Sequence, residues 1–169
     1  MFLFIVSCFG GGVDKKGSVV KYKSGVVYTE GGAFSIGVPS AHWIKSPFRF
    51  RAILFKNQDF PASMSVSSFC RGSFDEAPLP ILSKQAFYDL SNPQTLATKN
   101  VSLNGRAAIR VVKKGSLDGA SLLLDIVTLK MNACVFDFIL TSDQQHYKKI
   151  VGDFENFYGG FKYLHGPEI

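Results

Sequence analysis

Short apolar runs separated by glycine, proline and polar residues fill the amino-terminal half of the chain, and this pattern predicts β-strands. Residues 63–70 show it best, because Met64 and Val66 alternate with Ser65 and Ser67, as on a strand with one buried face. Three other strands are expected before this one, at residues 26–28, 34–38 and 50–55.

The middle of the chain predicts a helix. Leu82, Ala86 and Leu90 recur at four-residue spacing, so they would share one helical face. Pro80 suits the first turn of such a helix, and the Asn92-Pro93 dipeptide would end it.

A meander of strands is expected next. Asn104-Gly105 and Asp118-Gly119 are typical of the tightest hairpin turns. Residues 122–129 are largely apolar at both parities, whereas a strand with one wet face would alternate, so we expect both faces of the central sheet to be covered, at least in part. The expected strands cover residues 99–103, 106–112, 120–129 and 133–142.

A second helix near the carboxyl end would supply one cover. Ser142 and Gln145 have the spacing of a capping box, and Gly159-Gly160 would end the helix. Its apolar stripe consists of Tyr147, Ile150, Val151, Phe154, Phe157, Tyr158 and Phe161. Together the elements predict an α+β domain, a largely antiparallel β-sheet covered by helices.

Composition supports one folded domain. The chain has 169 residues, 46% of them hydrophobic, which is enough apolar material for a single core. The formal net charge is +6, but the basic residues are spread along the chain without an arginine-rich helix or an aromatic RNA-binding motif, so no nucleic-acid partner is expected. No apolar run reaches the ~18 residues that a membrane-spanning helix needs.

The order of these elements resembles the Mog1/PsbP/DcrB superfamily. Its members begin with a strand of the form F-S-I-x-x-P closely followed by tryptophan, which here is Phe34 to Pro39 and then Trp43. The resemblance covers residues 26–163. It implies an α-β-α sandwich and non-enzymatic work, with no catalytic set to carry over. Members include photosystem extrinsic subunits, a small-GTPase release factor and bacterial envelope lipoproteins.

The amino terminus resembles a bacterial lipobox. Ile5-Val6-Ser7-Cys8 gives an aliphatic residue, a variable one, a small one and then cysteine. The resemblance implies cleavage before Cys8, a diacylglycerol on its sulfur and usually a further acyl chain, which together anchor a protein stably. Signal peptides start with basic residues, and none precedes Cys8, so a buried first strand at residues 2–6 stays open as the alternative.

The glycine run at residues 10–12 favours the lipobox, because it suits a flexible tether. The expected organisation is a signal-peptide remnant at residues 1–7, a lipid-anchored tether at 8–25, the domain at 26–163 and a tail at 164–169. The protein is then expected in a bacterial cell envelope, on the membrane through its lipid, with another envelope protein as partner. Phe9 replaces the aspartate that retains lipoproteins at the inner membrane in enteric bacteria, which favours the outer membrane.

The remaining candidate chemistry is sparse. Cys70 and Cys134 lie in or beside predicted strands and can pair in an oxidising compartment, although free buried cysteines are common. Asp125 and Asp137 lie mid-strand among apolar residues. They can face each other as an acid–base pair, or they can point outward at a sheet edge or pair with a basic residue such as Arg110.

His42, His146 and His165 have no ligand spacing, so surface positions are expected for all three, with no metal or cofactor. No catalytic residue is predicted, and the chain is interpreted as a non-enzymatic binding or assembly module. One alternative is a small-ligand carrier or enzyme, for which Asp125, Asp137 and His42 would have to meet in one pocket. The other is a cytosolic regulatory protein.

Overall fold

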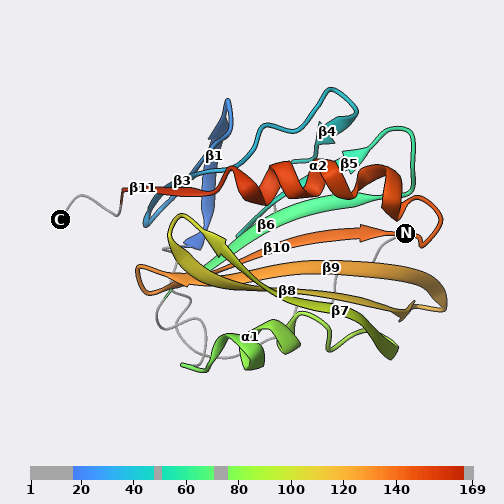
Figure 1. The fold of residues 1–169 in the computed structure, drawn as a ribbon. Coiled ribbons are helices and arrows are strands. Elements are labelled where there is room, and N and C mark those ends of the chain that lie inside the picture. The colour runs from blue at the N-terminus through green and yellow to red at the C-terminus, as the bar shows by residue number, and fades with distance from the viewer. Residues whose placement is uncertain (1–16, 48–50, 71–75, 166–169) are drawn as a thin grey trace.

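The structure is a computed structural model that describes residues 17–47, 51–70 and 76–165 (Figure 1). Two helices and eleven strands make up this part of the chain. In chain order they are β1 (Val19–Lys23), β2 (Val26–Thr29), β3 (Gly32–Ser35), β4 (Trp43–Lys45), β5 (Ala52–Asn57), β6 (Ser63–Cys70), α1 (Leu79–Gln85), β7 (Ser91–Leu103), β8 (Arg106–Leu117), β9 (Ala120–Met131), β10 (Cys134–Ser142), α2 (Tyr147–Gly159) and β11 (Lys162–His165).

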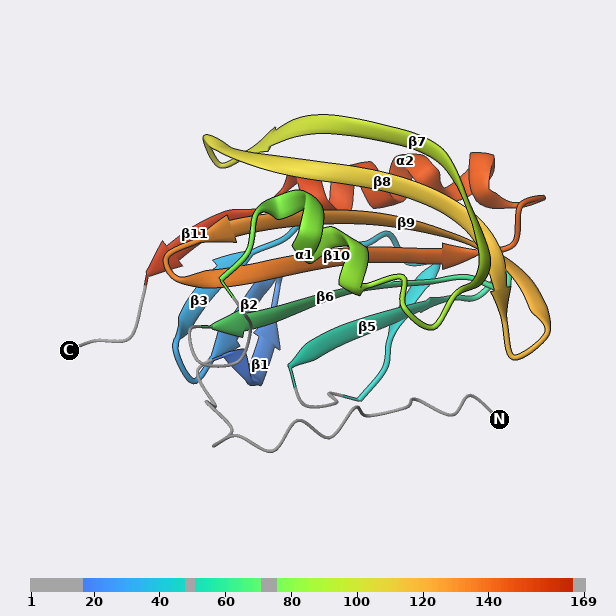
Figure 2. The same ribbon diagram turned by 90° about the horizontal axis from the view of Figure 1, so that it is seen from below.

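The strands form two antiparallel sheets. The larger has seven strands in the order β4-β5-β6-β10-β9-β8-β7, and the smaller has four in the order β1-β2-β3-β11. Helix α2 and the small sheet lie on one face of the large sheet, and α1 lies on the other, against β8 and β9 (Figures 1 and 2). The large sheet is therefore covered on both faces over part of its area, and the expected α+β architecture is confirmed.

The predicted hairpins connect β7, β8 and β9. Asn104 and Gly105 have φ angles of 49° and 74°, and Asp118 and Gly119 have φ angles of 51° and 81°. Positive φ at both central positions is the geometry of a type I′ turn, whose twist matches that of the strands it joins. These turns fix the register of β8 against its two neighbours, and this register decides which side chains meet on each face.

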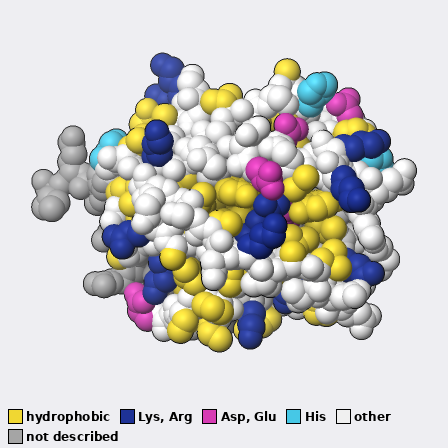
Figure 3. All heavy atoms as spheres, in the orientation of Figure 1, with side chains coloured by type: hydrophobic (Ala, Val, Ile, Leu, Met, Phe, Trp, Pro, Cys, Tyr) yellow, Lys and Arg dark blue, Asp and Glu magenta, His cyan; other side chains and the backbone are white. Residues whose placement is uncertain are grey.

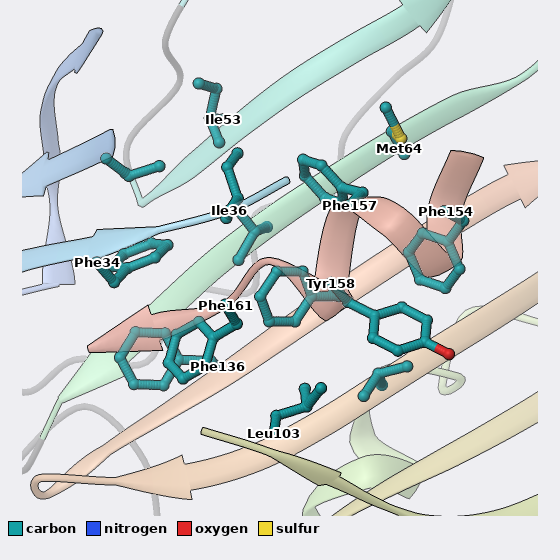
Figure 4. Close-up of a cluster of buried hydrophobic side chains, with 14 of the residues drawn as sticks. Phe34, Ile36, Ile53, Met64, Leu103, Phe136, Phe154, Phe157, Tyr158 and Phe161 are labelled. Atoms are coloured by element: carbon teal, nitrogen blue, oxygen red, sulfur yellow. The ribbon is translucent and has the colours of Figure 1, made fainter. Parts of the chain in front are cut away.

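Aromatic side chains fill the main core, between the large sheet and the layer made by α2 and the small sheet (Figure 4). Phe34 of β3 meets Phe136 of β10 with ring centroids 5.1 Å apart, and Phe157 of α2 meets Phe138 at 5.7 Å. Each fully buried phenylalanine contributes about 1.5–3 kcal/mol. A second, smaller core lies under α1 on the opposite face.

The F-S-I-x-x-P segment docks directly on the end of α2. The Gly37 N–H donates to the carbonyl of Phe157, and a Cβ added at Gly37 would lie 2.0 Å from the backbone oxygen of Asn156. Trp43 is buried in the core, and its indole N–H donates to an Asp153 carboxylate oxygen at 2.9 Å. The motif therefore serves packing, and it requires glycine at one of its variable positions.

The predicted boundaries need correction at both ends of the domain. Residues 19–23 of the expected tether form β1, which pairs with β2, and Gly17 is already buried. Residues 164 and 165 of the expected tail belong to β11, which pairs with β3. Strands β1 and β11 are so short that the alternation of their apolar and polar residues does not distinguish them from a linker in the sequence.

Two local predictions about helices are also wrong. Helix α1 ends at Gln85, so Leu90 packs from a turn, and β7 already includes Asn92 and Pro93. No capping box forms at Ser142 and Gln145. Instead, a carboxylate oxygen of Asp143 accepts the backbone N–H of His146, the residue that precedes α2, at 2.7 Å.

We expect Gly37→Ala to destabilise the protein by roughly 1–3 kcal/mol, because the new methyl group has to displace backbone of α2. Gly152→Ala, inside α2 with no atom within 4 Å of an added Cβ, is the matched control and should stabilise the protein by about 1 kcal/mol. Urea unfolding of both variants measures the two effects, and equal effects would contradict the close docking of the motif on α2.

Candidate functional site

The most elaborate cluster of polar side chains surrounds Arg110 of β8. Its guanidinium donates to Asp125 of β9 from Nε at 2.9 Å and from a terminal nitrogen at 2.6 Å. The other terminal nitrogen donates to Glu155 at 2.7 Å and to the Tyr158 hydroxyl at 3.0 Å. Tyr147 completes the cluster, because its hydroxyl donates to Asp125 at 2.7 Å. We call these five residues the Arg110 cluster.

Sheet register and helix periodicity bring these residues together. Arg110 lies opposite Val127 and Asp125 lies opposite Val112, so the two charged residues are diagonal neighbours on the α2 face of the sheet. Along α2, Tyr147, Glu155 and Tyr158 are separated by whole turns or nearly so, and all three reach the same point of the sheet. The cluster therefore ties α2 to the two strands beneath it.

Burial and pairing shift the pKa values of Arg110, Tyr147 and Tyr158 in this cluster. Burial alone would lower the pKa of Arg110, but hydrogen bonds to Asp125 and Glu155 outweigh it and raise the pKa. Burial, with the neighbouring Asp125, raises the pKa of the Tyr147 hydroxyl, and burial also raises that of Tyr158. Near neutral pH the guanidinium is therefore charged and both phenols are protonated.

Asp137 lies on the opposite face of the sheet. It pairs in register with Thr128, whereas Asp125 lies three residues from Thr128 along β9, on the other parity. The Thr128 hydroxyl donates to the Asp137 carboxylate at 2.7 Å, and burial raises the pKa of Asp137 to about 6. The two aspartates are thus separated by the sheet, and of the alternatives left open, pairing with Arg110 holds for Asp125.

The proposed pocket of Asp125, Asp137 and His42 is not formed. His42 is exposed near the β4 edge, 2.7 Å from an Asp59 carboxylate oxygen. His146 departs from the expected surface position, because it is half-buried and stacks on Phe60 at 4.7 Å. Within residues 17–47, 51–70 and 76–165, no group of three His, Cys, Asp or Glu side chains could hold a metal ion.

A cavity of about 170 Å³ lies between α1 and the strands β7 and β8. Ile109, Val111 and Phe87 give it apolar walls, and Lys113 reaches over the Phe87 ring at 4.5 Å. The remaining lining residues are Pro80, Ser83, Lys84, Thr95 and Thr98. Sites for drug-sized ligands usually enclose ~300–1,000 Å³, so this cavity suits a side chain better than a whole ligand.

The two cysteines of the domain lie opposite each other on neighbouring strands. Cys70 ends β6 and Cys134 begins β10, and the two are paired in register. Their sulfur atoms are joined 2.08 Å apart. Cys8, the predicted lipidation site, lies outside the described residues. No helix in the described ranges is long and apolar enough to span a membrane.

Sequence reasoning found Arg110 and Asp125 but missed their partners on α2. Glu155 and Tyr158 are three residues apart on one helical face, and Tyr147 is two turns before Glu155. A polar set on the otherwise apolar side of an amphipathic helix is the signal that points to a buried partner.

We expect Arg110→Met to destabilise the protein by about 3–5 kcal/mol, because it leaves the Asp125 carboxylate buried without its cation. Adding Asp125→Leu should recover most of this loss. Glu155→Gln is the milder control and should cost about 1 kcal/mol or less, since half of the Glu155 side chain is exposed. Urea unfolding tests the order, and an Arg110→Met variant as stable as Glu155→Gln would contradict it.

The raised pKa of Asp137 predicts that its ionisation opposes folding. Stability should fall as the pH rises from about 4 to about 6, since the folded protein holds this proton more tightly than the unfolded chain does. Asp137→Asn keeps an acceptor for Thr128 and should therefore exceed the parent in unfolding free energy at pH 8 but match it below pH 4. A constant difference across this range would show that the carboxyl titrates normally.

Comparison with known proteins places the chain by its fold. No family model matches the sequence, and no curated protein matches it. Solved structures are similar to it at low sequence identity, among them the following three. A protein from Bacteroides thetaiotaomicron VPI-5482 has a TM-score of 0.57 and 14% identity, covering 80% of this chain and 46% of its own.

The other two are described by function. The Ran-binding protein Mog1p of Saccharomyces cerevisiae has a TM-score of 0.54 and 9% identity, covering 77% of this chain and 89% of its own. LpqN of Mycobacterium tuberculosis is described as involved in cell envelope biogenesis. It has a TM-score of 0.52 and 15% identity, covering 78% of this chain and 83% of its own. At these identities the likeness concerns architecture, and the chain has an α+β fold like that of Mog1p, as the order of its elements predicted.

Proposed function

We propose that this protein is a lipid-anchored component of a bacterial cell envelope whose domain acts as a non-catalytic protein-binding or assembly module. The cross-strand pair of Cys70 and Cys134 is the observation that carries the location. Disulfides persist in oxidising compartments such as the periplasm and are rare in the cytosol. The pair therefore supports the envelope over the cytosolic alternative.

The polar chemistry of the domain supports binding over catalysis. The charged groups and hydroxyls of the Arg110 cluster form hydrogen bonds with one another. Asp125 and Asp137 lie on opposite faces of the sheet. The cavity beside α1 is small for a carried ligand. One protein of similar fold is described as Ran-binding, which agrees with a protein-binding module, and another as involved in cell envelope biogenesis, which agrees with the envelope location.

The short distance between the proposed anchor at Cys8 and the domain limits partners to those near the membrane surface. The Gly17 carbonyl accepts the Ser68 hydroxyl at 2.9 Å, so the folded part begins there at the latest. Residues 9–16 would then join Cys8 to the domain, and eight residues span at most about 28 Å when extended. A protein anchored at Cys8 would therefore meet its partners close to the membrane surface.

In a native host, we expect the protein expressed from its own gene to partition with membranes and to carry a lipid on Cys8. Cys8→Ser should move it to the soluble fraction. The double variant Cys70→Ser/Cys134→Ser is the matched control, because it removes cysteines without touching the anchor and should stay with membranes. Fractionation with intact-mass measurement checks all three proteins.

The same samples test the compartment. In protein from the envelope, Cys70 and Cys134 should resist alkylation until a reductant is added. An unmodified Met1 in soluble protein would defeat the anchor, and reactive thiols at both positions in untreated protein would defeat the oxidising location.

A further inference from the structure

The seven-stranded sheet ends in a long, open edge. Strand β7 has thirteen residues and only β8 beside it, and no described strand pairs with its outer side. At the opposite edge, β4 has only three residues. Natural proteins usually shorten, bend or cover such edges, because their free backbone groups pair readily with another strand. The exposed edge of β7 therefore calls for a physical explanation.

The two halves of β7 differ in how well they are protected against pairing with another strand. The first half is protected: Asn92 has a φ angle of 51°, Pro93 lacks an N–H, and the register shifts once before Gln94 and again before Ala97. From residue 97 to residue 103 the strand pairs with β8 without interruption. We call this regular half of β7, residues 97–103, the open edge.

The hairpin fixes which backbone groups of the open edge face outward. Leu103 and Arg106 flank the two-residue turn, so they form a hydrogen-bonded pair, and hydrogen-bonded pairs then alternate along the ladder. Ser102, Asn100 and Thr98 fall on the other parity. Their N–H and C=O groups point away from β8, and all three residues are exposed.

Lysine side chains lie on both faces beside the open edge. On the α2 face, the exposed Lys99 is the register partner of Arg110, whose acidic neighbours are already bonded to it. On the α1 face, Thr98 borders the cavity that Lys84 and Lys113 also line. Basic side chains are also spread over the α2 side of the molecule, around an apolar area with a basic centre (Figure 3).

This charge selects the kind of strand that can pair here. If a second copy paired antiparallel about Asn100, the two Lys99 side chains would be diagonal neighbours, and like charges across strands are destabilising. The net charge of +6 on each copy adds to the repulsion. An extended segment with acidic side chains meets the same edge with attraction on both faces.

We propose that the open edge of β7 binds an extended, acidic segment of a partner protein as an eighth strand of the sheet. The backbone groups of Thr98, Asn100 and Ser102 supply the pairing, Lys99 selects an acidic side chain on the α2 face, and the cavity beside α1 receives a side chain opposite Thr98. This inference rests on the binding role proposed above and names its surface and partner class.

The test uses the full chain and a short synthetic peptide that alternates glutamate with valine. Binding should shift the backbone amide resonances of Thr98, Asn100 and Ser102 and protect these amides from hydrogen exchange. The same peptide with alternate backbone nitrogens methylated has equal charge but cannot complete the ladder, and it should bind about tenfold more weakly or worse.

Asn100→Pro removes one outward N–H without removing a hydrogen bond to β8, and it should weaken peptide binding about tenfold or more. Asn100→Ala keeps the N–H and is the matched control, with binding expected within about twofold of the parent. Lys99→Glu should reverse the preference toward a lysine–valine peptide. Thermal unfolding of each variant confirms that it is folded before its binding is compared.

Several outcomes would overturn the proposal: no binding of the glutamate–valine peptide, equal binding of the methylated peptide, or shifts confined to residues outside β7. Concentration-dependent dimerisation through β7, or pairing of β7 with residues 2–6 of the same chain, would also overturn it by naming another occupant. None of these results bears on Cys8 or on membrane fractionation, so the proposed location stands or falls separately.

Discussion

The hydrogen bonds of the Arg110 cluster hold helix α2 and the large sheet in one arrangement. A buried carboxylate in the middle of β9 is costly unless a cation and hydrogen-bond donors surround it, and one guanidinium with one tyrosine hydroxyl supplies them. The guanidinium also donates to Glu155 and Tyr158 of α2, and these hydrogen bonds fix where α2 lies along the sheet. Apolar packing alone tolerates sliding, whereas a fork of directed hydrogen bonds does not.

The position of α2 in turn organises the rest of the main core. With the helix fixed, its end accepts the close approach of Gly37, and the phenylalanines of β3, β10 and α2 pack edge to face between the layers. The opposite face follows a simpler plan, with a short helix over a small apolar core and a narrow cavity beside it. The edge of the sheet at β7 has no described strand on its outer side.

Sequence reasoning succeeded where a local pattern determines structure. The Asn104-Gly105 and Asp118-Gly119 turns have positive φ angles, the stripe of α2 is buried, and the strand order gave the fold class. It failed where tertiary context decides. Strand β1 forms because β2 pairs with it. Asn92, which was predicted to end the first helix, instead belongs to the long strand β7.

The candidate sites show the same division. Pairing of Asp125 with Arg110 was one of the alternatives open in sequence, but only the register of three strands shows that Asp125 and Asp137 face opposite ways. The partners of Arg110 and Asp125 on α2 were not predicted, because they depend on where the helix packs against the sheet. The edge position of β7 was likewise not predicted, since being at the edge is a property of the sheet order.

The two paired cysteines also divide the chain in a way that the order of strands does not. Cys70 ends β6, and Cys134 begins the neighbouring strand β10, 64 residues later. When the bond is closed, α1, β7, β8 and β9 belong to a covalent ring, and everything else hangs from it as two tails. A protease that cuts once within the ring leaves a single molecule, whereas one cut in a tail releases a fragment. The lobe that holds β7 is therefore the part of this protein that a single cleavage cannot remove.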